Sequence, residues 1–328
     1  MFGVSLAIIS AAIFGFQNAA ARRAVVDGTP LQGILITVPP VVPLLFLVSF
    51  LVGGFDAMFD WTVKTYIYSG LAGIMHFVIG RNSNFHSMRA LGSILSTPIQ
   101  QLSTVISLFL AIIVLNESFT GLNVIGIVFL MIGPAILIGR RNSYSAASKT
   151  AKFVPNLRPG VFHGLICIIG YGASPILIVL ALQSVGPGID KLANSTAILF
   201  FSYFCASFIV LVLALLNNGF SSVLTMKAIS RNWFIVSGVM IAVSQVFRYG
   251  AFAFAPVSVV VPIQRLSIIF RLIFNVLLNR DYERFDLGIV LGILLSILGA
   301  VALGADTRTI LDLLKLEEPF YSLLNWRL

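Results

Sequence analysis

One nine-residue stretch occurs twice in this chain, and the spacing of its copies constrains the fold more than any other feature. The copies occupy residues 95–103 and 259–267, and Pro, Ile, Gln, Leu and Ser recur at a constant offset of 164 residues. After each copy come an apolar run, an acid (Glu117 or Asp281) and a further apolar run with two glycines. A match that continues through two successive runs indicates an internal duplication with a period of half the chain.

The apolar runs have the length of membrane spans. Of the 328 residues, 58% are hydrophobic and 10% are charged, whereas soluble domains carry about 25% charged residues. Apolar runs of roughly 20 residues cross a bilayer as helices, because lipid offers no partner to an exposed backbone. We therefore predict an all-α integral membrane protein with ten transmembrane helices. The predicted spans are 2–21, 31–52, 65–89, 93–115, 121–139, 160–182, 193–216, 233–254, 257–278 and 287–304.

A basic loop divides these spans into five plus five. The linker 140–159 separates a first five-helix repeat, 1–139, from a second, 160–304. Because five is odd, the two repeats must cross the membrane in opposite orientations, which is the inverted-repeat arrangement of many secondary transporters. The C-terminal tail, 305–328, mixes leucines with charges, and it is either an interfacial segment or a tail without function.

Prolines and glycines also recur in the two repeats. Pro98 and Pro262 occupy equivalent positions in the fourth and ninth spans. A matched pair of interrupted helices is a sequence indicator of a transporter's substrate site, so we expect hinges or gates there. The last span of each repeat contains a pair of glycines, such as Gly126 and Gly133, and such pairs predict close helix packing. The partner is either the other repeat or a second subunit in a homodimer.

Polar side chains follow the repeated stretch along one face of each helix. They are Gln100, Ser103 and Ser107 in the first copy, and Gln264, Ser267, Arg271 and Asn275 in the second. Polar groups that face lipid are destabilising, so both stripes should face the interior of the bundle. We interpret them as the lining of a water-accessible cavity, with hydrogen bonds between packed helices as the alternative.

The span before each stripe adds one arginine and one amide. Arg81 and Asn84 lie one turn apart in the third span, and Gln245 and Arg248 are their equivalents in the eighth. Charged residues inside a membrane usually have a function. Arg265 is a weaker indicator, because a long side chain near the end of a span can reach the interface.

The acidic residues show a complementary distribution. All 12 lie in loops, at span ends or in the tail, so cation coupling through an intramembrane carboxylate is not expected. His76 is the mid-span group that titrates near neutral pH, and it is either proton-sensitive or a hydrogen-bonded structural residue. No residues have metal-ligand or catalytic spacing, so we expect no metal, no cofactor and no enzymatic activity. An arginine-rich cavity favours substrates that carry a carboxylate or a phosphate.

Together these features resemble the drug/metabolite transporter (DMT) superfamily, in particular its EamA family. The resemblance rests on the segment 14–18 (Phe-Gly-Phe-Gln-Asn), on Asn84 before Ala90, on Ser96-x-Pro98, and on Glu117 after the fourth span. It covers residues 1–304 and implies a ten-helix inverted-repeat carrier. Such a carrier works by alternating access through a central cavity lined by the third, fourth, eighth and ninth spans. The arginines depart from that family's mostly apolar and aromatic lining.

We therefore predict a multi-pass transporter of a small organic metabolite, anionic or zwitterionic, that works by efflux or exchange in the cell (inner or cytoplasmic) membrane. The substrate should lie between Gln100 and Gln264, with Arg81, Arg248 and Arg271 attracting its negative group. The alternatives are an exporter of hydrophobic drugs or toxic metabolites and a membrane-embedded lipid-modifying enzyme. The expected partners are a small-molecule substrate and the lipid bilayer. Nucleic acid is not expected, since the basic residues sit at span ends, where they set topology.

The orientation of the chain has two conflicting indications. The positive-inside rule places the basic central loop in the cytoplasm and both termini outside. The family resemblance implies both termini inside.

Overall fold

The computed structural model describes residues 2–117, 120–139, 153–186 and 190–280, with scattered positions between 291 and 302. Across these residues the regular elements are helices. Six helical stretches of the described chain are long and apolar enough to cross a membrane. This agrees with the predicted all-α membrane class. The tenth predicted span, the tail and most of the basic linker lie largely or wholly outside the described residues, as does Asp281.

The elements before the basic linker follow the first five predicted spans. They are α1 (Phe2–Val25), α2 (Pro30–Thr37), η1 (Pro39–Val41), α3 (Val42–Leu51), α4 (Gly54–Ala57), η2 (Met58–Asp60), α5 (Val63–Gly73), η3 (Ile74–Gly80), α6 (Arg81–Leu91), α7 (Ser93–Gln101), α8 (Ser103–Leu115) and α9 (Gly121–Gly139). Those after the linker are α11 (Leu157–Ser184), α12 (Lys191–Leu216), α13 (Gly219–Leu224), α14 (Ala228–Phe254), α15 (Val257–Gln264) and α16 (Ser267–Leu278).

Several predicted spans are interrupted helices. The second is broken at Val38, where Pro39 and Pro40 open a short 3-10 turn, because proline cannot donate the next helical hydrogen bond. The third runs continuously from α5 to α6, but η3 in its middle is a π-helix. π-Helical turns are rare and are frequently found at functional sites.

The fourth and ninth spans break at the same repeat position. Leu102 separates α7 from α8 with φ −60° and ψ −17°, and Leu266 precedes α16 with φ −58° and ψ −18°. Each break is closed by i→i+3 hydrogen bonds, from Leu102 N to Ile99 O (3.1 Å) and from Leu266 N to Ile263 O (3.0 Å). Both breaks lie four residues after the proline, Pro98 in α7 and Pro262 in α15. The repeated stretch therefore has the same backbone in both copies.

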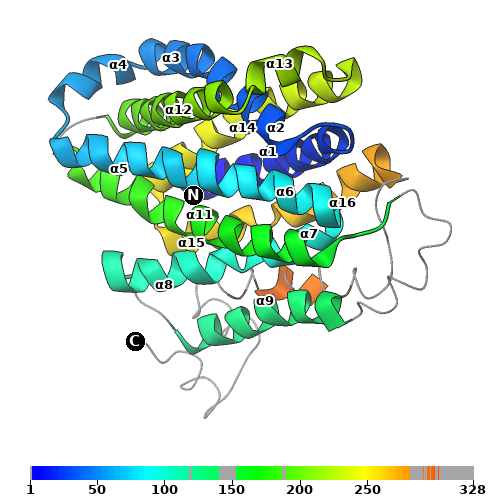
Figure 1. Cartoon of the computed structure of the whole chain (residues 1–328). Helices are drawn as coiled ribbons and strands as arrows, with labels where there is room; N and C mark the ends of the chain where they lie inside the picture. The colour runs from blue at the N-terminus through cyan, green and yellow to red at the C-terminus, as the bar shows by residue number, and fades with distance from the viewer. Residues whose placement is uncertain are drawn as a thin grey trace, which may run out of the picture.

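The first helix of each half packs mainly against helices of the other half. α1 packs along α14 and against α15 and α16, whereas α11 packs along α5, η3 and α6 and against α7 and α8. Figure 1 shows α1, α11 and α14 within the bundle, between α3, α12 and α13 on one side and α8 and α9 on the other. Each first helix thus packs mainly on the opposite half.

Two contacts fix these helices closely. A Cβ on Gly170 of α11 would lie 2.6 Å from Met75 O and 2.7 Å from Gly80 N, so α11 touches the η3 backbone directly. The Glu117 carboxylate accepts hydrogen bonds from Val257 N (3.0 Å) and Ser258 N (2.9 Å) at the start of α15. An acid at a helix N-terminus satisfies free backbone donors and complements the helix dipole. The acid after the first repeated stretch therefore anchors the helix that contains the second.

Candidate functional site

A cavity of about 40 Å³ lies where the two copies of the repeated stretch meet. Elements of both halves form its walls: α1, η3 and α7 from the first, and α11, α14, α15 and α16 from the second. Polar side chains dominate the lining: Ser10, Asn18, His76, Thr97, Gln100, Gln101, Tyr171, Gln245, Arg248, Gln264, Arg265, Ser267 and Arg271. This volume holds about three water molecules, so the cavity must widen to admit a metabolite.

Arg271 lies on one side of the cavity and binds the first half. Its Nε donates to Ser93 Oγ (2.7 Å), its Nη1 to Gln100 Oε1 (2.9 Å) and its Nη2 to Ser96 Oγ (3.1 Å). All three guanidinium nitrogens therefore have an acceptor on α7. Gln100 in turn donates to Asn84 Oδ1, which extends the network to α6.

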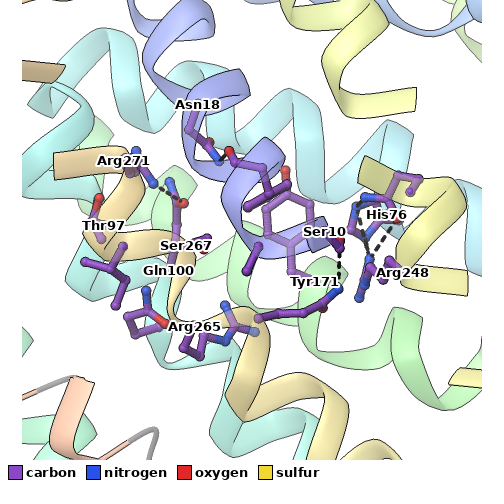
Figure 2. Close-up of a pocket in the computed structure, with 16 residues that line it drawn as sticks. Ser10, Asn18, His76, Thr97, Gln100, Tyr171, Arg248, Arg265, Ser267 and Arg271 are labelled. Carbon is purple, nitrogen blue, oxygen red and sulfur yellow. Dashed lines mark hydrogen bonds between the residues drawn. The ribbon is translucent and has the colours of Figure 1, made fainter. Parts of the chain in front are cut away.

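Arg248 lies on the other side, next to His76 (Figure 2). Its Nη1 is 3.1 Å from His76 Nδ1 and 3.3 Å from Gln245 Oε1. Its buried Nε has no hydrogen-bond partner among the described residues. The His76 ring is held by Ser174 Oγ at 3.2 Å and by the tilted Tyr171 ring, whose centroid lies 4.7 Å from that of His76. Arg248 thus reaches the cavity with only neutral acceptors around it.

Arg265 completes the set of arginines that line the cavity. It follows directly after α15, in the turn before α16, and Figure 2 places it between the other two. Its buried Nε also has no partner among the described residues. Its repeat-equivalent Gln101, the last residue of α7, lines the cavity as well. The sequence interpretation allowed the Arg265 side chain to reach the interface, and the structure instead places this residue in the cavity lining.

The charge of the lining is unbalanced. Among the described residues, three arginines line the cavity and no Asp or Glu does. Buried charges are strongly destabilising unless an opposite charge or several hydrogen bonds compensate them. Arg271 has such bonds, whereas Arg248 and Arg265 each retain an unsatisfied nitrogen. The cavity is therefore suited to an anion.

The predicted site residues fall into three groups. Those that line the cavity are Gln100, Gln245, Arg248, Gln264, Ser267, Arg271 and His76. Asn84, Ser103 and Asn275 lie behind the lining. The Asn84 side chain bonds to the Gln100 side chain, and Ser103 bonds to Gln100 O. Asn275 bonds to Ser93, which also accepts a hydrogen bond from Arg271. Arg81 and Ser107 are not among the lining residues.

Arg81 does not belong to the cavity lining, so it is removed from the predicted anion site. Its Nε donates to Thr37 Oγ1 (3.0 Å), its Nη2 reaches Ser237 Oγ (3.4 Å), and its guanidinium lies 4.9 Å from the Phe85 ring. Buried and occupied in this way, it supports the packing of α2, α6 and α14. Ser107 likewise donates to Gly172 O (2.8 Å), which joins α8 to α11.

Sequence reasoning missed one wall of the cavity. Ser10, Phe14 and Asn18 of α1 all face it. They recur every four residues, so their common helical face could have been found from the sequence. Tyr171, Thr97 and Gln101 also line the cavity but have no periodic neighbours that would have singled them out.

A second pocket of about 560 Å³, the end pocket, lies further along α11 and α14. Its lining includes Leu115 and Glu117 at the end of α8, Lys191 at the start of α12, and the chain between α14 and α15. Arg22, Arg89, Arg158 and Arg280 lie at the opposite end of the helices, which we call the basic end.

Comparisons with known proteins agree with this architecture. Residues 1–139 match the family model of the EamA-like transporter family, and residues 195–328 match the model named magnesium transporter NIPA. One protein of known crystal structure superposes with a TM-score of 0.59 at 14% identity, over 91% of this chain and 95% of its own. At that identity the likeness shows a shared fold. A search of curated protein sequences gave no match.

Proposed function

We propose, from the premise that this chain is a multi-pass membrane transporter with an EamA-like first half, that it carries small organic anions through the central cavity. The observation behind this proposal is the uncompensated positive charge of the lining. Arg248 and Arg265 line the cavity, each has a buried Nε without a partner among the described residues, and no described lining residue is a carboxylate. A carboxylate or phosphate accepts two parallel hydrogen bonds from a guanidinium, so it matches both groups.

The same lining favours a simple anion over a zwitterion. An amino acid carries an ammonium, which needs an acidic or strongly polar partner inside a membrane. The polar groups near the arginines are mostly amides, among them Gln100, Gln245 and Gln264, and they suit hydroxyl or carbonyl groups on the rest of the substrate. The lining therefore favours, among the predicted anionic and zwitterionic substrates, an anion without an ammonium group.

A divalent cation is the second candidate, because of the NIPA match over residues 195–328. Mg²⁺ prefers oxygen ligands, usually one or two carboxylates together with waters. Three arginines on the cavity wall repel such an ion. The electrostatics of the described cavity therefore favour the anion, and a binding experiment separates the two candidates.

Purified protein would be titrated with four probes in a thermal-shift assay: succinate, glycerol 3-phosphate, alanine and MgCl₂. A hydrophobic cation, ethidium, represents the drug-exporter alternative. We expect stabilisation by succinate or glycerol 3-phosphate only. The double variant Arg248→Gln/Arg265→Gln should lower the anion's affinity by about 100-fold or more, as is usual when a buried charge partner is removed.

Arg89→Gln is the matched control, because Arg89 is exposed at the end of α6 and does not line the cavity. It should bind the anion as the wild type does. Unchanged anion affinity in the double variant would exclude the arginine site. Stabilisation by Mg²⁺ alone, or by ethidium alone, would replace the anion proposal with the corresponding alternative.

A further inference from the structure

The same helix contact occurs twice, once in each orientation. α7 packs against α16, and its repeat-equivalent α15 packs against α8. The first contact lies toward the basic end, where α16 ends, and the second lies toward the end pocket, which Leu115 of α8 lines. The chemistry of the two contacts differs, although their backbone breaks are alike.

The α7–α16 contact is a ladder of hydrogen bonds between the halves. Arg271, Asn275 and Asn279 succeed each other every four residues, so they share one face of α16 and its C-cap. Asn275, one turn further along α16 than Arg271, donates from Nδ2 to Ser93 Oγ (3.2 Å). Asn279 Nδ2 donates to Ala19 O of α1 (2.9 Å). Each of the three side chains thus binds the opposite half.

The α8–α15 contact is held in another way, by Glu117 just after α8, which accepts hydrogen bonds from Val257 N and Ser258 N. The equivalents of Arg271, Asn275 and Asn279 are Ser107, Ala111 and Leu115. The equivalents of the acceptors Ser93 and Ser96 are Val257 and Val260. The pocket of about 560 Å³ lies at this end. Among the described residues, the side-chain ladder therefore belongs to the basic end, and a carboxylate at a helix N-terminus holds the other contact.

Arg271 belongs to both the ladder and the cavity, since it lines the cavity while it bonds to α7. We infer that Arg271 is a substrate-operated latch: the negative group of the substrate takes over its guanidinium from Ser93, Ser96 and Gln100, and the basic end then opens. The inference rests on the proposed anion function. It adds a role for Arg271 that differs from that of Arg248: Arg271 is bonded to α7 through all three guanidinium nitrogens, whereas Arg248 reaches the first half through Nη1, at His76.

The strengths of the competing bonds favour this exchange. A carboxylate or phosphate adds the attraction between opposite charges and can accept two parallel hydrogen bonds from one guanidinium, which neutral hydroxyl and amide oxygens cannot do. The acceptors that Arg271 has in α7 are neutral. A ligand shifts a two-state equilibrium only by its differential affinity for the two states, and this exchange supplies that difference. The cavity of about 40 Å³ also cannot hold a metabolite until the halves separate.

Spin labels across the basic end test the latch. Arg89 at the end of α6 and Arg280 beyond α16 are both exposed and belong to opposite halves. They would be replaced by labelled cysteines in a chain whose two native cysteines, Cys167 and Cys205, are changed to alanine. Distances would be measured by double electron–electron resonance in nanodiscs, without ligand and with saturating succinate or glycerol 3-phosphate.

The key variant is Ser93→Ala/Ser96→Ala, which removes two acceptors of the latch but no cavity-lining residue. We expect it to raise the ratio of long to short distances by about tenfold or more without ligand, as the loss of two charge-assisted hydrogen bonds implies. The matched control is Ser195→Ala/Ser207→Ala. Among the described residues, those hydroxyls bond to the backbone of their own helix, α12, at Leu192 O and Tyr203 O. The control should leave the distances unchanged.

The spin-label distances and the thermal-shift assay test the latch and the anion function separately. An unchanged distance distribution in Ser93→Ala/Ser96→Ala overturns the latch whatever the substrate is. An anion that binds in the thermal-shift assay but leaves the distances short overturns the latch and preserves the proposed function. If neither anion binds, the proposed function fails, and the serine variant still decides whether the ladder holds the basic end closed.

Discussion

Arg271 and Arg248 line the same cavity, yet their surroundings differ. Arg271 donates to three oxygens of α7 through all three of its nitrogens. Arg248 has a histidine ring and one amide oxygen near its Nη1, and its Nε has no partner among the described residues. Burial alone does not separate them, because both are less than 10% exposed, at 5% and 7%.

Under the proposed anion function, the difference separates an arginine that holds the fold while no substrate is bound from one that lacks a full set of partners until an anion binds. A buried arginine whose donors are all satisfied stabilises the fold. One with an unsatisfied donor destabilises the fold, and it is retained where a ligand completes its bonds. Arg81 belongs with Arg271 by this criterion, and Arg265 belongs with Arg248. Four substitutions test the distinction, from the largest expected effect to the smallest.

Arg271→Leu should have the largest effect on stability. It removes three charge-assisted hydrogen bonds between the halves and leaves their acceptors on α7 buried. We expect a loss of about 3–5 kcal/mol in the free energy of unfolding. The measurement is denaturation by SDS in mixed micelles, followed by circular dichroism. A loss below about 1 kcal/mol would place Arg271 with the unsatisfied arginines.

Arg81→Met should destabilise the fold by an intermediate amount. The guanidinium bonds to Thr37 and Ser237 and lies over Phe85, but it does not line the cavity. We expect a loss of about 1.5–3 kcal/mol in the same assay, with the anion's affinity unchanged in the folded protein. A large drop in affinity without a loss of stability would return Arg81 to the anion site.

Arg265→Met should stabilise the protein in the absence of ligand. Replacing an incompletely satisfied charge with an apolar chain of similar length removes a desolvation penalty, and we expect a gain of about 1 kcal/mol. The stabilisation that an added anion confers on the wild type should shrink or vanish. Thermal-shift curves with and without succinate measure both effects. Destabilisation without ligand would show that Arg265 has a structural role.

Arg89→Gln should change almost nothing. Arg89 is exposed at the end of α6, away from the cavity lining. Surface substitutions usually change stability by less than about 0.5 kcal/mol. Equal unfolding curves and equal anion affinities for the variant and the wild type set the baseline for the other three. A clear change in either would mean that general loss of positive charge explains part of the other results.

The helical class and many of the span positions could be predicted from the sequence, because continuous apolar runs leave a chain in lipid few alternatives. The expectation that Pro98 and Pro262 mark interruptions agrees with the breaks that end α7 and α15. The π-helical η3 was not predictable, since no residue type in 74–80 marks a π-turn as proline marks a kink. Close contacts at Gly170 and Gly73 fix that segment, and each of these contacts joins the first half of the chain to the second.

Only part of the predicted polar stripes lines the cavity, and packing explains the difference. Gln264, Ser267 and Arg271 line it across the turn after α15, whereas Ser103 and Ser107, after the equivalent turn, do not. Ser103 donates to Gln100 O, and Ser107 donates to Gly172 O of α11, which packs against α8. Sequence periodicity identifies a polar helix face, but the neighbouring helix that this face meets depends on contacts between segments far apart in the chain.

The packing of α1 against helices of the second half has a consequence for biosynthesis. Ser10 and Ser244 bond reciprocally, with each hydroxyl 2.9 Å from the other's carbonyl oxygen, and Gln17 donates to Ser237 Oγ (3.1 Å). These partners are synthesised more than 200 residues after α1, a delay of roughly 10–50 s at usual translation rates. During that interval Ser10 and Gln17 lack these partners. The contacts that fix α1 against α14 can therefore form only after most of the second half has been synthesised.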